Sequence, residues 1–133
     1  MTTTLYHVQL NVSDAKVSFP FYMAFFKYFE YEIEGFGDDG MSAKNNTTDF
    51  WIFETHELHK HKNFHRKQTG LNHLAFKVKS KENVDLFFKE FLQPRNIEPL
   101  YSSPKIFKEY REDYYAVYFD DPDRIKIKVM YFE

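Results

Sequence analysis

His7 and His73 are the two residues of this chain whose placement most directly indicates chemistry. They occupy the same position in two halves that repeat each other at an offset of 66 residues (73 minus 7). At that offset apolar residues coincide as well: Val8 with Leu74, Leu10 with Phe76, Val12 with Val78, Phe21 with Phe87 and Phe25 with Phe91. Such matching over half of the chain indicates an internal duplication. An imidazole nitrogen can ligate a metal or form a hydrogen bond with a substrate, so both histidines are candidate site residues.

The last stretch of the chain adds a candidate cation to the two histidines. Residues 125–131 alternate as in a strand with one buried face and one polar face. The apolar set is expected to pack in the core: Ile125, Ile127 and Val129. The other set is expected to point away from the core: Lys126, Lys128 and Met130. The ammonium of Lys128 could bind an anionic substrate or stabilise an oxyanion, and a solvated surface lysine is the alternative interpretation.

The same alternation places further polar side chains on faces that point away from the core. One strand pattern has His7, Gln9 and Asn11 on such a face. Another has Tyr114 and Tyr118 on one face and Tyr115, Val117 and Phe119 on the other, and one of these two faces is expected to line the site. We therefore regard Gln9, Asn11, Tyr114 and Tyr118 as candidates for contacts with a substrate.

The elements that would position these residues follow from hydrophobic periodicity. Strands are predicted at residues 6–12, 31–36, 41–45, 49–54, 71–78, 97–101, 114–119 and 125–131. One helix is predicted to follow the cap Ser13-Asp14, and a second to begin at the cap Ser80 and end at Pro94. Each helix is followed by three strands without another helix, which favours an α+β fold over alternating βα units.

The whole chain, 1–133, is expected to form a single domain of two modules. Module one covers about residues 1–56, module two about 70–133, and the polar stretch between them is predicted to be a loop. In the first helix an apolar stripe is predicted at Val17, Phe21, Ala24, Phe25 and Tyr28. Pro20 interrupts that stripe and predicts either a helix that begins near Ser18 or a bent first turn. The second helix is predicted to bury Val84, Phe87, Phe88 and Phe91.

Composition and charge argue against several classes of protein. The chain has no cysteine, and therefore no disulfide framework, thiolate metal site or cysteine nucleophile. Its formal net charge of −2 gives a nucleic-acid partner no electrostatic support. The N-terminus lacks the pattern of a signal peptide, and no apolar run reaches the ~20 residues that span a bilayer. We therefore expect a cytoplasmic protein that binds neither nucleic acid nor membrane.

Three segments of the chain match a known pattern. Residues 5–14, Leu-Tyr-His-Val-Gln-Leu-Asn-Val-Ser-Asp, combine a strand with a helix cap, and residues 70–78, Gly-Leu-Asn-His-Leu-Ala-Phe-Lys-Val, form a second such strand. Residues 115–127 contain Asp-Pro-Asp-Arg between two strands. In this order and spacing they resemble the first strand, fifth strand and last hairpin of the vicinal oxygen chelate superfamily. This superfamily includes glyoxalases, bleomycin-resistance proteins and extradiol dioxygenases. Its last hairpin usually has the sequence Asp-Pro-Asp-Gly. The resemblance covers essentially the whole chain and implies two tandem βαβββ modules forming a curled mixed sheet.

The resemblance also implies a cup in which a divalent metal (zinc, nickel, manganese or iron) is chelated by two oxygens of the substrate. The usual ligands in the family are a histidine on the first strand, a histidine on the fifth and a glutamate on the eighth. Some members add a ligand near the end of the fourth strand. His7 and His73 match the two histidine positions. Many single-chain members are homodimers with cups at the interface, so the resemblance implies a homodimer here.

Two positions depart from that ligand set. The eighth-strand glutamate falls on Lys128, whose ammonium cannot ligate a cation and would repel one. The fourth-strand position falls on Phe53, and the neighbouring Glu54 points to the other face unless a bulge restores it. We therefore predict that Lys128 points into a cup bordered by His7 and His73, and that the family triad binds no metal.

Two functions stay open at this point. The first is a glyoxalase-like lyase, isomerase or dioxygenase, in which His7 and His73 contact a divalent metal or the substrate and Lys128 and Glu54 act as catalytic groups. The second is a non-catalytic protein that sequesters a small aromatic or anionic compound without metal, as bleomycin-resistance proteins do. The His-rich stretch 56–61 matches no helical zinc motif and offers a weaker alternative metal site.

Overall fold

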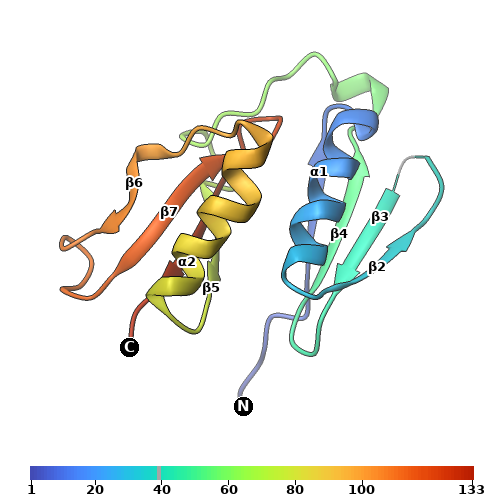
Figure 1. Cartoon of the computed structure of the whole chain (residues 1–133). Helices are drawn as coiled ribbons and strands as arrows, with labels where there is room; N and C mark the ends of the chain where they lie inside the picture. Colours follow the sequence, from blue (N-terminus) through green and yellow to red (C-terminus); the bar gives the residue numbers. More distant parts are fainter. Residues whose placement is uncertain (39) are drawn as a thin grey trace. The chain divides into compact units, whose positions relative to one another are not determined.

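The structure, a computed structural model, describes residues 1–38 and 40–133 (Figure 1). It divides into two compact units, Met1–Asn63 and Phe64–Glu133. The division falls inside the loop that the sequence predicts between the two modules. In the residues described, no helix is both long and apolar enough to span a membrane.

The first unit contains one helix and one four-stranded mixed sheet. Its elements are β1 (His7–Val12), α1 (Ala15–Tyr28), β2 (Glu32–Gly35), β3 (Gly40–Lys44), β4 (Asp49–Glu54) and the 3-10 turn η1 (Glu57–His59). The strand order is β1-β4-β3-β2, with β1 parallel to β4 and the other pairs antiparallel. Because β1 and β4 are parallel neighbours, their side chains share the same two faces in register.

The second unit repeats this arrangement. Its elements are β5 (His73–Lys77), α2 (Lys81–Phe87), the π-helical turn η2 (Phe88–Leu92), the 3-10 turn η3 (Gln93–Arg95), β6 (Leu100–Ile106), β7 (Tyr115–Asp120) and β8 (Lys126–Tyr131). The strand order is β5-β8-β7-β6, with β5 parallel to β8. The equal order of the two sheets confirms the predicted α+β fold of two tandem βαβββ modules.

The helix α1 begins earlier than Pro20 suggested and buries a different stripe. It starts at Ala15 because the Asp14 carboxylate accepts a hydrogen bond from the Lys16 amide at 2.9 Å, and Pro20 lies inside the helix. Val17, predicted to face the core, is 54% exposed. The buried set is Ala15, Ser18, Tyr22, Phe25 and Phe26. Ser18, whose side chain is small, belongs to this buried face. Phe26 of the same face packs against Phe50 of the sheet, and their ring centroids are 4.9 Å apart.

In the second unit the predicted core face is confirmed in large part. Ser80 caps α2 by accepting a hydrogen bond from the Asn83 amide at 3.2 Å. The side chains buried against the sheet are Val84, Phe87, Phe91 and Leu92, and Phe88 is half-buried. The rings of Phe87 and Phe119 of β7 lie 5.5 Å apart, and Ile127 and Val129 of β8 are fully buried. The helix therefore covers one face of this sheet, and the alternate residues of β7 and β8 point to the other.

The strand β6 lies later in the chain than predicted. It was expected at 97–101 and spans Leu100–Ile106, with a shift of register between Leu100 and Lys105. Tyr101 and Ser102 both have positive φ, so the strand bends where alternation would require it to run straight. Pro94 does not end the helical segment but lies within the turn η3.

A hydrogen bond between α2 and the sheet gives a pH-dependent contribution to stability. The Tyr115 hydroxyl donates to Asp85 at 2.7 Å, and burial together with this carboxylate raises the pKa of Tyr115 to about 12. An unfolded tyrosine ionises near pH 10, so between about pH 10 and pH 12 the unfolded state binds fewer protons than the folded state, and stability falls as pH rises.

We expect Tyr115→Phe to lose less stability than wild type between pH 9 and pH 11 in urea unfolding. Tyr6→Phe, at a 72% exposed position, is the control and should follow wild type. An identical pH dependence of Tyr115→Phe and wild type would contradict the assignment.

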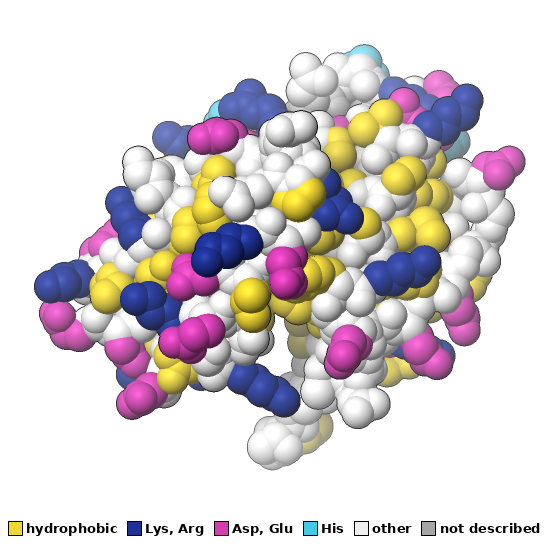
Figure 2. All heavy atoms as spheres, viewed as in Figure 1, with side chains coloured by type: hydrophobic (Ala, Val, Ile, Leu, Met, Phe, Trp, Pro, Cys, Tyr) yellow, Lys and Arg dark blue, Asp and Glu magenta, His cyan; other side chains and the backbone are white. Residues whose placement is uncertain are grey.

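Charged side chains of both signs are interspersed on the face of the molecule seen in Figure 2. Lysines, arginines, aspartates and glutamates alternate there with apolar groups, and no single-sign field covers this face.

Candidate functional site

The first sheet has a helix-free face, formed by the side chains that point away from α1. His7, Gln9 and Asn11 of β1 are exposed there, and the residues between them are buried or half-buried. The β1–β4 register places Trp51 beside Gln9 and Phe53 beside Asn11, and the two rings are nearly parallel with centroids 6.3 Å apart. The face thus presents an imidazole and two amides along a pair of stacked rings.

The ring of Phe53 lies across the backbone of β3 at Gly40. A Cβ atom at residue 40 would lie 2.6 Å from a carbon of that ring, which is closer than side-chain atoms approach. Glycine at this position therefore allows the Phe53 ring to lie flat against the strand.

Glu54 lies on the other, helix-covered side of this sheet. Its carboxylate accepts a hydrogen bond from the Ala15 amide at 3.0 Å and forms an ion pair with Lys60 at 3.2 Å. These contacts lower the pKa of Glu54, the hydrogen bond from Ala15 being the largest cause. The β1–β4 ladder continues without a bulge to Val12 and Glu54, so nothing turns this side chain toward His7. Glu54 holds the start of α1, and we do not carry it into the proposed site.

In the second unit, Lys128 lies on the helix-free face and is only 8% exposed. Its Nζ atom lies 5.5, 5.2 and 5.4 Å from the ring centroids of Tyr110, Tyr114 and Tyr118. These three rings, which we call the tyrosine cage, attract the ammonium through cation–π interactions. No carboxylate forms an ion pair with Lys128 in residues 1–38 and 40–133. The site therefore holds a buried positive charge that forms no ion pair with a carboxylate of the described residues.

The hydroxyl group of Tyr118 is a second unsatisfied group at this place. Its oxygen is buried and has no partner of good hydrogen-bond geometry among the described residues. Burial raises the pKa of Tyr118 well above its usual value, and the nearby Tyr110 and Tyr114 add to the effect. A buried hydroxyl without a partner costs about 1–3 kcal/mol, so an acceptor atom of a ligand would be favoured here.

His73 lies on the same face, beside Lys126 in the β5–β8 ladder. The Asn72 side chain donates to the Arg66 carbonyl at 3.0 Å, so its amide oxygen faces His73 Nδ1 at 2.8 Å. In the neutral ring Nδ1 then carries the proton, and Nε2 keeps a free lone pair. Burial, and after it the charges of Lys128 and Lys126, lower the pKa of His73. The neutral imidazole is thus favoured beside two ammonium groups.

A pocket of about 350 Å³ opens in front of these residues. Its lining combines two lysines, one glutamate, one asparagine, one histidine and four aromatic rings: Asn72, His73, Tyr101, Lys105, Phe107, Glu109, Tyr110, Tyr118 and Lys126. Lys126 donates a hydrogen bond to the Tyr101 hydroxyl at 3.3 Å. Of the residues predicted from sequence, His73 and Tyr118 line this pocket, whereas Tyr114 packs beneath it against Lys128. The rings of Tyr101, Phe107 and Tyr110 were not predicted as site residues.

The residues around His73 do not fit the divalent metal that the family implies. A divalent ion on His73 Nε2 would lie beside Lys126 and Lys128, whose charges act on this ring. Two unit charges 4 Å apart repel each other by about 4 kcal/mol at an effective dielectric of 20, and a divalent ion doubles this energy for each ammonium. Within each unit, the described residues contain no group of three His, Asp or Glu side chains that could hold an ion. The surroundings of His73 therefore disfavour a divalent cation.

Two of the four histidines of the connecting loop accept hydrogen bonds from the backbone. The Leu58 amide donates to His56 Nδ1 at 3.2 Å, and the Lys67 amide donates to His65 Nδ1 at 3.2 Å. These two rings shape turns of the loop.

A metal-content measurement tests the fit of the donor set. We expect protein purified without a polyhistidine tag to retain far less than one divalent ion per chain after incubation with zinc or manganese and gel filtration. Lys128→Glu, which supplies the family's carboxylate, should retain more metal than wild type. Stoichiometric metal in wild type that disappears in His73→Ala would contradict this expectation.

The comparisons with known proteins agree with the fold. No family model matches the chain. The Bacillus subtilis protein YqjT, whose function is uncharacterized, is 33% identical over 126 residues that cover 95% of this chain and 97% of YqjT. The crystal structure of a proposed glyoxalase from Bacillus halodurans is 34% identical, with a TM-score of 0.86 over 95% of this chain and 93% of that chain.

More distant structures share the fold. A glyoxylase/bleomycin resistance protein/dioxygenase domain from Frankia sp. EAN1pec is 21% identical with a TM-score of 0.73, and the alignment covers both chains completely. The fosfomycin resistance protein FosX from Listeria monocytogenes is 20% identical with a TM-score of 0.69, over 100% of this chain and 94% of that chain. With the two four-stranded βαβββ modules and the relative at 34% identity, this chain belongs to the glyoxalase/bleomycin resistance/dioxygenase group of the vicinal oxygen chelate superfamily.

Proposed function

We propose that this protein is a glyoxalase-like enzyme that acts on a small organic anion bound at the helix-free face of the second sheet. The buried Lys128 ammonium carries the proposal, because its charge is enclosed by the tyrosine cage and forms no ion pair with a carboxylate in the part of the chain that the structure describes. A ligand carboxylate, enolate or oxyanion beside it would complete the charge balance of the site. The nearby Lys126 and Lys105 favour the same sign of ligand.

The residues of this face have separate roles in the proposal. Lys128 stabilises negative charge that is present or develops on a substrate oxygen. The Tyr118 hydroxyl donates to the same ligand, since residues 1–38 and 40–133 offer it no partner of good hydrogen-bond geometry. Tyr114 positions the ammonium. His73 offers the Nε2 lone pair as a hydrogen-bond acceptor for a substrate proton, with Asn72 fixing the ring.

The helix-free face of the first sheet, with His7, Gln9 and Asn11, is proposed to make small-molecule contacts of its own. We also propose that residues 1–133 form a single domain, that the protein is a homodimer and that it is located in the cytoplasm.

A second function, sequestration without turnover, is favoured by the lining of the pocket. Four aromatic side chains surround it, Tyr101, Phe107, Tyr110 and Tyr118, and rings of this kind bind a planar ligand without any chemical step. Such a protein needs neither a metal nor a general base.

Thermal shift and calorimetry with benzoate and pyruvate in EDTA test the anion site. We expect at least one of these carboxylates to raise the unfolding temperature without metal, and benzyl alcohol, the uncharged control, to leave it unchanged. Wild-type protein that responds to neither carboxylate, or equally to benzyl alcohol, contradicts the proposal. Turnover followed by proton NMR, with pyruvate and with α-hydroxy and α-keto aldehydes, then separates an enzyme from a binder.

A further inference from the structure

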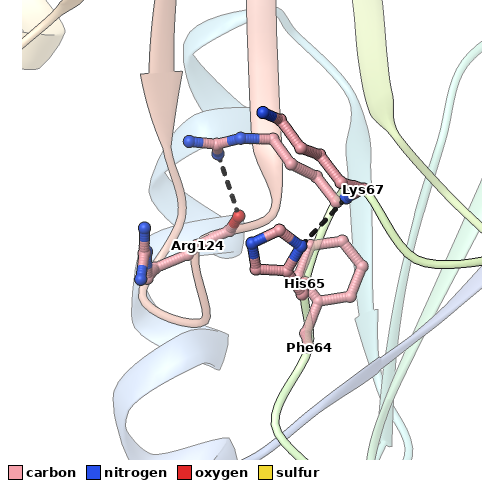
Figure 3. Close-up of a pocket in the computed structure, with 5 residues that line it drawn as sticks. Phe64, His65, Lys67 and Arg124 are labelled. Carbon is pink, nitrogen blue, oxygen red and sulfur yellow. Dashed lines mark hydrogen bonds between the residues drawn. The ribbon is translucent and has the colours of Figure 1, made fainter.

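A second pocket of the second unit shares no lining residue with the pocket beside Lys128. It has a volume of about 230 Å³ and is lined by Phe64, His65, Arg66, Lys67 and Arg124 (Figure 3). Three of these five side chains are permanently cationic, and no carboxylate belongs to the lining. Figure 3 shows the His65 ring in the view between Arg124 and Lys67, with Phe64 next to it.

Arg124 occupies a backbone conformation that favours glycine. Its φ is 65°, within the left-handed region, at a turn where the family usually has glycine. The turn is rigid, because the Asp121 carboxylate accepts hydrogen bonds from the Asp123 amide at 2.8 Å and the Ile125 amide at 2.7 Å. A side chain held in a strained conformation at the edge of a pocket points to a function of that side chain.

The charges of the pocket are only partly neutralised. Arg66 forms an ion pair with Asp120 and donates to the Arg124 carbonyl at 3.3 Å, which fixes the loop to the turn. The side chains of Lys67 and Arg124 make no ion pair or hydrogen bond in the part of the chain that the structure describes. In neutral His65, Nδ1 accepts from the Lys67 amide, so Nε2 carries the proton and can donate.

We propose that this pocket binds a phosphate group, with Arg124, Lys67 and His65 as donors. A planar guanidinium and an ammonium suit the oxygens of a tetrahedral dianion, and the imidazole supplies a further donor. Phe64 provides an apolar wall, which fits the organic part of a phosphate ester. The site is independent of the function proposed for Lys128.

Calorimetric titration with inorganic phosphate and with phenyl phosphate, at ionic strength matched with chloride, tests the site. We expect wild type to bind phosphate groups and Arg124→Gly to bind them at least about tenfold more weakly. Since glycine relieves the strained φ, the unfolding temperature of Arg124→Gly should be unchanged or higher. Tighter binding of phenyl phosphate assigns the site to a phosphate ester, and equal binding assigns it to the free anion.

Two further variants keep the test specific. Lys67→Gln should weaken phosphate binding in the same direction as Arg124→Gly. Lys89→Gln removes one charge from an exposed position of the same unit, so it should bind phosphate like wild type. The proposal is overturned if wild type binds neither phosphate at millimolar concentration, or if Arg124→Gly binds as wild type does. An equal loss in Lys89→Gln overturns it too.

Discussion

Replacing Lys128 with methionine is expected to weaken the binding of a carboxylate such as benzoate about 10- to 100-fold, because a hydrogen bond to a charged group is worth about 1.5–3 kcal/mol. The same change should leave the free energy of unfolding unchanged or raise it, since an apolar chain of similar length replaces a buried charge. Calorimetry and urea unfolding on the same preparations measure the two effects.

Lys79→Met is the control for this prediction, because it removes a charge from an exposed position of the second unit. It should bind benzoate as wild type does. If Lys128→Met binds benzoate with unchanged affinity, Lys128 has no part in the anion site. A large loss of stability in Lys128→Met would instead assign the ammonium to holding the tyrosine cage together.

The second large effect concerns the core of the second unit. Phe87→Ala is expected to lower the free energy of unfolding by about 3–5 kcal/mol, because the Phe87 side chain is fully buried and packs against Phe91 and Phe119. Leu86→Ala is the control in the same helix: Leu86 is 44% exposed, and its loss should cost less than about 1 kcal/mol.

The same variant tests whether the chain unfolds as the single domain that the sequence predicts. Trp51 is the only tryptophan and lies in the first unit, so its fluorescence reports that unit alone. If residues 1–133 unfold as one domain, Phe87→Ala will shift the Trp51 transition and the far-UV circular dichroism transition by the same amount. A Trp51 transition that stays at its wild-type midpoint would show that the units unfold separately.

Strict alternation predicted the strands best. It gave the correct faces of β1 and β8, because a half-buried strand allows only one register. An apolar run after a turn gave β4 at its observed bounds, Asp49–Glu54. Alternation failed at β6, where two residues with positive φ bend the chain and break it. In α1 the count of large apolar residues favoured Val17, whereas the helix turns the small Ser18 toward the sheet. Close approach of a helix depends on the shape of both surfaces, which periodicity does not report.

For the site, the alternation of side chains along each strand predicted only the face of the sheet on which a residue lies. Lys128 and His73 were expected on one face, and the structure places them there. The surroundings of Lys128 were not predictable, since Tyr110 belongs to the loop between β6 and β7, which is held by backbone bonds such as Phe107 to Tyr114 at 2.8 Å. The only sequence signal for this loop was the density of tyrosine between residues 101 and 118.

The close approach of Phe53 to Gly40 also limits the order in which substitutions at these two positions can occur during evolution. A side chain at residue 40 would enter the volume of the Phe53 ring, so the ring must be replaced by a smaller group first. If residue 40 is enlarged first, the intermediate protein has to displace strand β3 or the Phe53 ring in order to fold. Related sequences should accordingly carry a larger residue at position 40 only together with a smaller one at position 53, and a double-mutant cycle at these positions should show strong coupling.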